Sequence, residues 1–326
     1  MASNENPYPP SPKVLAAIAK AAFEINRYPD GGCFQLRRTL ARKLNVDDDQ
    51  LIFGNGSDEI IVLAVKAFAA KGDEVIIAKP SFLIYEIAST LSGARLHQVL
   101  LKDFRYDLDA MKAKINARTR IIFIGNPDNP AGTYITQRQA EDFLKRVPKS
   151  TLVFFDEAYF EYVHTKDYPD TLGLLKKYPN LVIARTFSKM YGLAGLRVGY
   201  GIATPEIIDI LNRLREPFNV NSIAQAAAVA ALNDESFYRN IAKDVEVQRQ
   251  YLYRSLKAME ISYEESFTNF ILVHVGGDST ETAKTLLKKG VIIRDMAAWG
   301  LKGYIRVSIG SESENKRFIK SLGESL

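Results

Sequence analysis

Residues 181–192 read Leu181-Val182-Ile183-Ala184-Arg185-Thr186-Phe187-Ser188-Lys189-Met190-Tyr191-Gly192, a short apolar run that passes directly into a polar loop. Runs of the same kind, rich in Val, Ile and Phe, recur with helix-length segments between them at 51–53, 74–78, 94–99, 121–124, 152–155 and 198–202. Short strands that are apolar on both faces are typical of a parallel sheet, because each crossover connection places a helix on one face. The sequence therefore predicts an α/β fold with a mostly parallel, seven-stranded sheet between helix layers.

The pattern changes after residue 222. A long helical stretch at 223–258 precedes three separated strands, which we expect at 270–275, 291–294 and 304–308. At the other end, Pro7, Pro9, Pro10 and Pro12 exclude a helix and favour an extended arm before a helix that begins near Pro12. We predict an arm and helix at 1–27 that join a small domain, a large domain at 28–222, and a small α+β domain at 223–326 that includes the long helix.

Composition excludes several classes of protein. The chain has 326 residues, of which 47% are hydrophobic and 25% charged, which is typical of a globular protein. The net charge of +5 comes from interspersed residues without a block of like charges, so nucleic-acid binding is not indicated. Cys33 is the single cysteine, and there is neither a secretion signal nor an apolar stretch long enough to span a membrane. We expect a cytoplasmic protein that binds neither nucleic acid nor membrane.

Lys189 lies among small and apolar residues just after a predicted strand. A desolvated amine is partly neutral and can attack an aldehyde, which is the usual way in which a protein holds pyridoxal 5'-phosphate. An exposed loop lysine is the simpler interpretation when Lys189 is considered alone.

Polar residues follow two further predicted strands. Asp156 comes directly after the run at 152–155, at the sheet edge where α/β proteins bind ligands, and would pair with a protonated pyridine nitrogen. Helix capping is an equally good explanation of Asp156 alone. Tyr159 and Asn129, the latter in a loop after the run at 121–124, would point at the phenolic oxygen of the same ring, although Asn129 lies in a sequence that also favours a plain turn.

The fourth motif is Phe53-Gly54-Asn55-Gly56-Ser57-Asp58, a strand end followed by a glycine turn and the start of a helix. Free amides at a helix N-terminus bind phosphate, and glycine lets the anion approach the backbone. Simple capping by Ser57 or Asp58 is the alternative.

Taken together, these motifs resemble the fold-type I aminotransferases. The resemblance spans nearly the whole chain and rests on the order and rough spacing of Asn129, Asp156, Tyr159, Ser188, Lys189 and Arg197. Within that group, Ser3-Asn4-Glu5-Asn6-Pro7-Tyr8 and Arg27-Tyr28-Pro29-Asp30-Gly31-Gly32 are similar to the opening motifs of histidinol-phosphate aminotransferases.

The resemblance implies a role for each matching residue. Lys189 would hold pyridoxal phosphate and carry the proton, Asp156 would pair with the ring nitrogen, and Asn129 and Tyr159 would bind the phenolic oxygen. Phe82 would stack on the ring. The phosphate would lie among Gly56, Ser57, Asp58, Ser188 and Arg197, with Tyr28 donated by a second subunit, which implies a homodimer.

Two arginines near the C-terminus match the substrate-binding segments of the same family. Arg306, in Tyr304-Ile305-Arg306-Val307-Ser308, would clamp the α-carboxylate through two parallel hydrogen bonds. Arg294 would meet the phosphate of the substrate, helped by Tyr8, and Asn129 would lie beside the substrate. A surface ion pair is the simpler interpretation of either arginine alone.

Three features depart from the family pattern or limit the site. Asp128 and Ala131 stand where relatives more often have Asn and Thr, which we expect to alter loop packing rather than chemistry. Relatives usually carry a further segment before the first motif, and it generally supports the dimer. The three histidines, His97, His164 and His274, lack ligand spacing, so no metal site is expected.

The resemblance implies a ping-pong transamination between glutamate and imidazole-acetol phosphate that yields L-histidinol phosphate in histidine biosynthesis. An aromatic amino acid aminotransferase and a threonine-phosphate decarboxylase share nearly every cofactor residue and remain alternatives. A cofactor-binding regulator without turnover is a third, but such regulators usually fuse a DNA-binding domain, for which this chain has no room.

Overall fold

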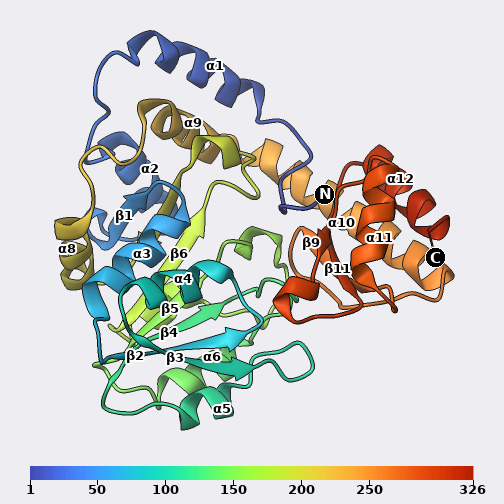
Figure 1. Ribbon diagram of the computed structural model, residues 1–326. Helices are drawn as coiled ribbons and strands as arrows, with labels where there is room; N and C mark the ends of the chain where they lie inside the picture. The colour runs from blue at the N-terminus through green and yellow to red at the C-terminus, as the bar shows by residue number, and fades with distance from the viewer. Residues whose placement is uncertain (326) are drawn as a thin grey trace.

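The computed structural model describes residues 1–325 and contains two separate sheets (Figure 1). The large sheet has seven strands in the order β1-β7-β6-β5-β4-β2-β3. Its strands are β1 (Leu51–Gly54), β2 (Glu74–Lys79), β3 (Arg95–Leu100), β4 (Thr119–Gly125), β5 (Leu152–Asp156), β6 (Leu181–Thr186) and β7 (Gly199–Ile202). Each predicted strand of this sheet is present, and the expected α/β fold is confirmed.

The large sheet is mostly parallel because helices form most of its crossovers. The pairs β2–β3, β2–β4, β4–β5 and β5–β6 are parallel. Strand β7 is antiparallel to both of its neighbours, β6 and β1. The connection from β6 to β7 holds only the short 3-10 helix η4 (Ala194–Leu196), so the chain turns back beside β6 instead of crossing over.

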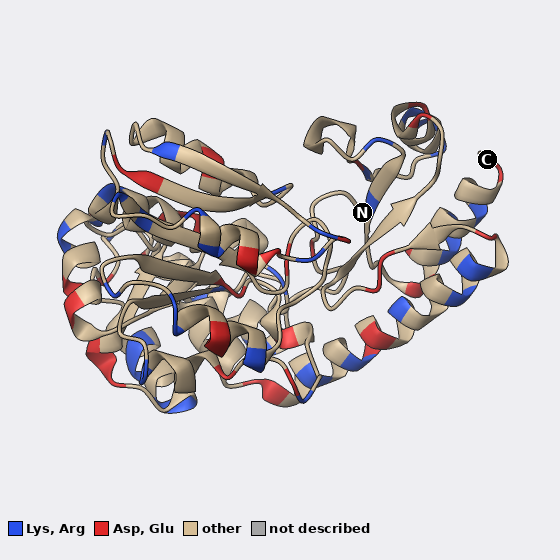
Figure 2. Ribbon diagram, turned by 90° about the horizontal axis from the view of Figure 1, so that it is seen from below, with Lys and Arg blue, Asp and Glu red and all other residues tan. Residues whose placement is uncertain are grey.

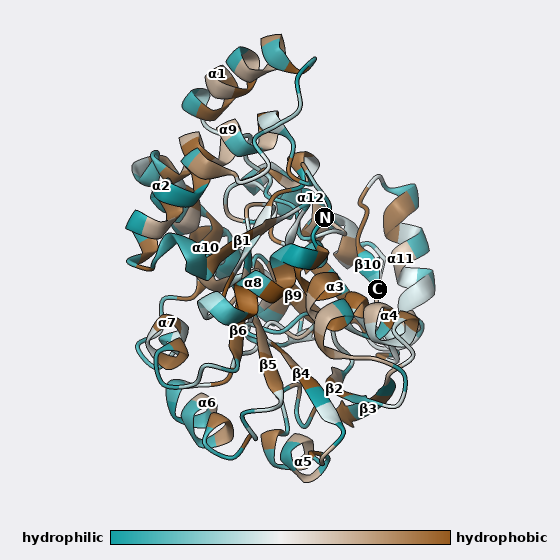
Figure 3. Cartoon of the chain, turned by 90° about the vertical axis from the view of Figure 1, so that its left-hand side faces the viewer, coloured by the Kyte–Doolittle hydropathy of each residue, from teal (hydrophilic) through white to brown (hydrophobic). Residues whose placement is uncertain are grey.

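Both faces of the large sheet are buried, which explains its continuously apolar strands. Along β4, Ile121 and Phe123 pack into the core that contains α3 (Ser57–Phe68), α4 (Leu83–Leu91) and α8 (Pro205–Leu214). Ile122 and Ile124 face the opposite core. That core contains α2 (Phe34–Leu44), α6 (Gln137–Leu144), α7 (Thr171–Leu175) and α9 (Ser222–Leu232), with α5 (Leu108–Ala113) close by. Figure 3 shows the hydrophobic strands of this sheet near the centre of the molecule.

The small sheet has the order β10-β11-β9-β8 and is antiparallel throughout. It consists of β8 (Ser262–Tyr263), β9 (Phe270–His274), β10 (Arg294–Asp295) and β11 (Tyr304–Ser308), and it lies with α11 (Ser279–Lys288) and α12 (Glu312–Gly323). Helix α10 (Glu235–Ala258) leads into it from the large sheet (Figure 1). The two strands predicted at 270–275 and 304–308 are present.

Two details of this C-terminal region differ from expectation. The helical stretch predicted at 223–258 is two helices, since α9 ends before the Asn233–Asp234 step and α10 begins after it. The strand predicted at 291–294 is only Arg294–Asp295. Val291 and Ile293 are buried and Ile292 is exposed, so the apolar sequence pattern from which the strand was predicted extends beyond the backbone pairing.

The N-terminal arm runs between the two sheets before α1 (Pro12–Ala21) begins (Figure 1). Ser11 caps α1 by accepting a hydrogen bond from the Val14 amide at 3.3 Å, and Pro12 occupies the first turn. The carbonyl of Met1 accepts a hydrogen bond from the Ser308 amide of β11 at 2.9 Å, whereas α1 packs on α9. The domain boundaries themselves stay a prediction.

Charged residues of both signs alternate over the surface, as Figure 2 shows along α10. Among residues 1–325, no helix combines the length and the apolar character that crossing a membrane requires.

Candidate active site

A cavity of about 330 Å³ lies where the carboxyl ends of β1, β4, β5 and β6 meet the small sheet and the arm. Parallel strands bring the loops that follow them to one edge of the sheet, so residues far apart in the sequence meet there. The predicted site residues that line this cavity are Ser57, Asp58, Phe82, Asn129, Asp156, Tyr159, Ser188, Lys189, Arg197, Arg294 and Arg306.

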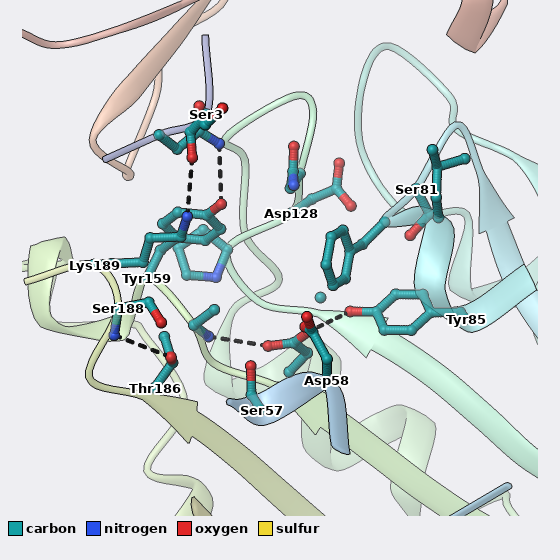
Figure 4. Close-up of a pocket in the computed structure, with 18 of the residues that line it drawn as sticks. Ser3, Ser57, Asp58, Ser81, Tyr85, Asp128, Tyr159, Thr186, Ser188 and Lys189 are labelled. Carbon is teal, nitrogen blue, oxygen red and sulfur yellow. Dashed lines mark hydrogen bonds between the residues drawn. The ribbon is translucent and has the colours of Figure 1, made fainter. Parts of the chain in front are cut away.

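Lys189 is the only lysine among the described residues that line the cavity. It follows β6, and its Nζ donates a hydrogen bond to the carbonyl of Ser3 in the arm at 3.1 Å. The same nitrogen lies 5.7 Å from the centre of the Tyr159 ring (Figure 4). The loop is fixed by the Ser188 amide, which donates to the Thr186 hydroxyl at 3.1 Å. The arm and the loop therefore hold the amine inside the cavity.

Asp156 ends β5 as a buried carboxylate in the cavity floor. Its Oδ2 accepts a hydrogen bond from the Tyr85 hydroxyl at 2.7 Å, and its Oδ1 accepts one from the Ala158 amide at 3.1 Å. Burial raises the pKa of Asp156 to about 6, although the bond from Tyr85 opposes the rise. The next helical turn, η3 (Phe160–Tyr162), has Tyr159 at its N-cap position, so Asp156 does not cap it.

The polar ends of Asn129 and Tyr159 form hydrogen bonds with the small sheet and with the arm. The Asn129 side-chain oxygen accepts a hydrogen bond from Arg306 of the small sheet. The Tyr159 hydroxyl accepts one from the Asn4 side chain at 3.0 Å. Both side chains therefore connect the large sheet to the arm or the small sheet.

The N-terminus of α3 faces the cavity beside Arg197. Gly56 is the residue before the helix and has φ +85, and a Cβ placed on it would lie 2.3 Å from Arg197 Nη2. That nitrogen lies 3.3 Å from Asp58 Oδ2. A helix N-terminus with a guanidinium beside it attracts an anion, and only a glycine leaves room for the guanidinium here.

Two arginines face each other on the small sheet. Arg294 of β10 and Arg306 of β11 are direct cross-strand partners. Arg306 is 5% exposed, its Nη2 donates to the Ala2 carbonyl at 3.1 Å, and its buried Nε has no partner among the described residues. Burial and the charge of Arg294 both lower the pKa of Arg306. Like charges at directly opposed positions destabilise a sheet, so this pair is suited to an anionic ligand.

Comparison with known proteins agrees with this arrangement. The profile described as aminotransferase class I and II matches residues 1–322. The chain belongs to this family. The aminotransferase is 47% identical to the histidinol-phosphate aminotransferase of Moorella thermoacetica, over 100% of this chain and 85% of that protein. It is 44% identical to the protein of the same name from Caldicellulosiruptor saccharolyticus, over 100% of this chain and 91% of that one.

Solved structures also resemble the aminotransferase. The crystal structure of histidinol-phosphate aminotransferase from Sinorhizobium meliloti in complex with pyridoxal-5'-phosphate has a TM-score of 0.93 at 29% identity, over 99% of this chain and 89% of that one. The Clostridium acetobutylicum histidinol-phosphate aminotransferase has a TM-score of 0.91 at 26% identity, over 99% and 97%. The aspartate aminotransferase of Thermus thermophilus with maleate, at 19% identity, shares the fold.

Three predicted site residues of the aminotransferase do not line the cavity of the single chain, namely Gly56, Tyr8 and Tyr28. Gly56 lies beside the cavity, against Arg197. Tyr8 lines a separate groove with Asp244, Gln248 and Ser311, so this chain alone does not bring it to the substrate arginines. Tyr28 is 83% exposed and stacks on Phe218 with ring centres 4.8 Å apart. The roles predicted for both tyrosines stay predictions.

The sequence analysis did not identify several residues that line the cavity. Tyr85 follows Phe82 by about one helical turn, a spacing that could have indicated a shared face. Trp299, the single tryptophan, lies with its ring centre 5.7 Å from the Arg306 guanidinium. Ser3 and Asn4 belonged to a quoted motif but had no assigned role. In residues 1–325, no group of three or more His, Cys, Asp or Glu side chains is arranged to hold a metal ion.

Proposed function

We propose that this aminotransferase transfers an amino group between L-histidinol phosphate and 2-oxoglutarate, with pyridoxal phosphate as its cofactor. The observation that carries the proposal is one cavity that combines Lys189, the buried Asp156 and the opposed arginines Arg294 and Arg306. The names of the relatives at 44% to 47% identity support the substrate.

The residues of the cavity fit this cofactor. Asp156 is a buried carboxylate without a cationic side-chain partner among the described residues, and it suits a protonated ring nitrogen. The Arg197 guanidinium packs against Gly56 at the start of α3, where a Cβ would clash with it, and a guanidinium beside a helix N-terminus suits a phosphate. When bound, pyridoxal phosphate carries the amino group and accepts the electron pair left when the substrate loses its Cα proton.

Lys189 is the base of the proposed reaction. Its Nζ takes the proton from the substrate Cα and returns it to the carbon that bears the transferred nitrogen. The Ser3 carbonyl, 3.1 Å away, accepts a hydrogen bond that keeps this nitrogen above the cavity floor. The arm thus orients the group that moves the proton.

The remaining cofactor contacts come from the large sheet. Ser57, Asp58, Ser188 and Arg197, with Gly56, would bind the phosphate, and Phe82 would stack on the ring. Tyr159 and Asn129 would bind the phenolic oxygen. The centre of the Tyr159 ring lies 5.7 Å from the Lys189 nitrogen, so this side chain would contact both the cofactor ring and the base.

Substrate recognition falls to the small sheet. Arg306 would bind the α-carboxylate, with Asn129 holding one edge of the guanidinium as it does in the free protein. Arg294, an exposed neighbour, would bind the phosphate of one substrate or the side-chain carboxylate of glutamate. Tyr8 does not line this cavity in the single chain, so its predicted help at that phosphate would need an assembly that brings it there. A shared anionic subsite explains how one cavity serves both substrates.

The proposed assembly is a cytoplasmic homodimer. The segment from Phe23 to Phe34 exposes large apolar side chains, namely Phe23 at 88%, Ile25 at 66%, Tyr28 at 83% and Phe34 at 59%. Apolar side chains gathered this way mark a protein interface. In such a dimer, Tyr28 would reach the cofactor phosphate that the partner subunit binds. The lone Cys33 calls for no oxidising compartment, which supports a cytoplasmic location.

Purified protein loaded with pyridoxal phosphate tests the proposal. We expect glutamate-dependent conversion of imidazole-acetol phosphate to L-histidinol phosphate, and borohydride treatment should attach the cofactor to Lys189 in peptide mass mapping. Lys189→Ala should abolish both results, whereas Lys66→Ala on the exposed side of α3 should change neither. Faster turnover of aromatic amino acids, or release of carbon dioxide from threonine phosphate, would instead support one of the two alternative activities.

A further inference from the structure

Asp128 is a second buried carboxylate in the wall of the cavity. Its side chain has no exposed surface, and the residue lines the same cavity as Asp156. The roles proposed so far do not use it. Burying a carboxylate is costly unless hydrogen bonds and charges compensate, so its position calls for an explanation.

Hydrogen bonds fix Asp128 in place without a cationic partner. Oδ1 accepts a bond from the Tyr106 hydroxyl at 3.2 Å, and Oδ2 accepts one from the Ala131 amide at 3.2 Å. No described lysine, arginine or histidine forms an ion pair with Asp128. The positively charged Arg306 bonds to the neighbouring Asn129 instead.

Each of the two carboxylates accepts a hydrogen bond from a tyrosine whose hydroxyl lies beside Gly125. Tyr85 donates to Asp156, and Tyr106 donates to Asp128 while it accepts a bond from the Gly125 amide at 2.8 Å. A Cβ on Gly125 would lie 3.4 Å from the Tyr106 oxygen and 3.5 Å from the Tyr85 oxygen. Both hydroxyls therefore converge on the one residue of β4 that pairs with Asp156.

This arrangement places two buried carboxylates without cationic partners under the cavity. The pKa of Asp128 is raised to about 7, mainly by burial and also by the nearby Asp156, while the hydrogen bonds oppose the rise. Burial also keeps both tyrosines protonated by raising their pKa values well above the ordinary range. A cation placed in the cavity would compensate both carboxylates.

We propose that Asp128 is a positioning residue that acts with Asp156 to favour the protonated, cationic form of the cofactor ring. Asp156 would contact the ring nitrogen, and Asp128 would add a second negative charge from the wall, held by Tyr106. Since the interior has a low effective dielectric constant, a charge without direct contact still strengthens the binding of a cation. The inference rests on the proposed cofactor and is independent of the amino-acid substrate.

The test compares two ligands of the cofactor-free protein: pyridoxal phosphate and its deaza analogue, in which C–H replaces the ring nitrogen. Both carry the same aldehyde and phosphate, so the contributions of Lys189 and of the phosphate site cancel in the ratio of their dissociation constants. Asp128→Asn removes the charge and keeps the shape. We expect it to reduce the preference for pyridoxal phosphate about three- to tenfold, with the affinity for the analogue unchanged within about twofold.

Two further variants make the outcome decisive. Asp128→Ser removes the same charge and replaces Asp128→Asn if the asparagine variant does not fold. Tyr106→Phe removes the hydroxyl but keeps the carboxylate, and because the bond from Tyr106 favours the ionised form of Asp128, we expect a smaller loss of the preference than in the charge-removing variants. An unchanged preference in the charge-removing variants, or an equal loss in Tyr106→Phe, would overturn the inference. Failure of the wild-type protein to bind pyridoxal phosphate would instead refute the proposed function.

Discussion

Arg294 and Arg306 show how two residues of one type come to differ in role. They are cross-strand partners, yet Arg306 is buried and forms hydrogen bonds with Asn129 and Ala2. Arg294 is exposed and its side chain forms no hydrogen bond with residues 1–325. A buried, oriented guanidinium suits the planar α-carboxylate of glutamate. An exposed guanidinium suits a group whose size varies.

Replacing Arg294 with alanine should therefore weaken this anionic subsite without affecting the cofactor site. Loss of a charge-assisted pair with the phosphate should raise KM for imidazole-acetol phosphate about 10- to 100-fold. The dissociation constant of pyridoxal phosphate should not change, because the cofactor contacts lie on the other sheet. Lys302→Ala removes a positive charge from an exposed position of the same region and serves as the control. Equal kinetics for Arg294→Ala and the wild type would show that Arg294 is not part of the subsite.

The buried carboxylates should make the stability of the cofactor-free protein depend on pH. Folding raises the pKa of Asp128 to about 7 and that of Asp156 to about 6, so the folded state binds more protons than the unfolded state over this range. Their favourable contribution is present at low pH and is lost as the pH rises through these values. The groups that face Asp128 are Asp156 from β5 and Tyr106 from the loop before α5.

Urea unfolding of the cofactor-free protein measures this effect. Between about pH 5.5 and about pH 8, the loss in free energy of unfolding should be smaller in Asp128→Asn than in the wild type by about 2 kcal/mol. Identical losses in the two proteins would mean that Asp128 is already ionised at the lower pH.

At the scale of single residues, sequence motifs predicted the groups that meet at the cavity but not what supports them. Lys189, Asp156 and Asn129 each follow a strand end, where the fold brings loops together. Tyr85, Tyr106 and Asp128 belong to segments whose sequence gives no signal for a shared network. Their contact depends on the placement of α4 and of the loop before α5 over β4, which local patterns do not specify.

Among the elements beside the cavity, the start of α3 imposes a strict geometric demand. Gly56→Ala would place a methyl group against the Arg197 guanidinium at a residue with φ +85. We expect the affinity for pyridoxal phosphate to fall at least about tenfold, since both the backbone turn and the anion site are disturbed. Isothermal titration of the cofactor-free protein measures this loss.

Gly195→Ala provides a matched control for that experiment. Gly195 lies in η4 close to Arg197 in sequence, and a Cβ there would meet no atom within 4 Å. Its cofactor affinity should equal that of the wild type. A similar loss in both variants would indicate a general disturbance of the loop before β7 rather than a specific clash.

The elements themselves were largely predictable because burial on both sides leaves a continuous apolar signal. The strands of the large sheet other than the edge strand β3 carry that signal, and so do β9 and β11. The two-residue strands β8 and β10 do not, because pairing this short is decided by the strands beside them. The break between α9 and α10 falls at Asn233 and Asp234, in a segment whose flanks both favour helix.

For the molecule as a whole, the exposed segment from Phe23 to Phe34 predicts self-association. Phe34→Asp should shift the protein from dimer to monomer in sedimentation equilibrium and weaken cofactor binding, because Tyr28 would no longer reach the partner subunit. Leu100→Asp is the control: Leu100 is 73% exposed on the edge strand β3, at the opposite edge of the sheet from β1. A monomeric wild-type protein, or equal dissociation of both variants, would contradict the predicted interface.

The groups proposed to bind the cofactor and those proposed to bind the substrate lie on different sheets, and separate stretches of the gene encode them. Every cofactor group proposed from the large sheet lies between Gly56 and Arg197, whereas the two guanidiniums lie between Arg294 and Arg306. Asn129 and the arm residues Ala2 and Ser3 are among the contacts through which the halves meet. Exchanging the C-terminal stretch for that of a relative is thus a route to new substrate preferences that leaves the chemistry of the vitamin B6 cofactor untouched.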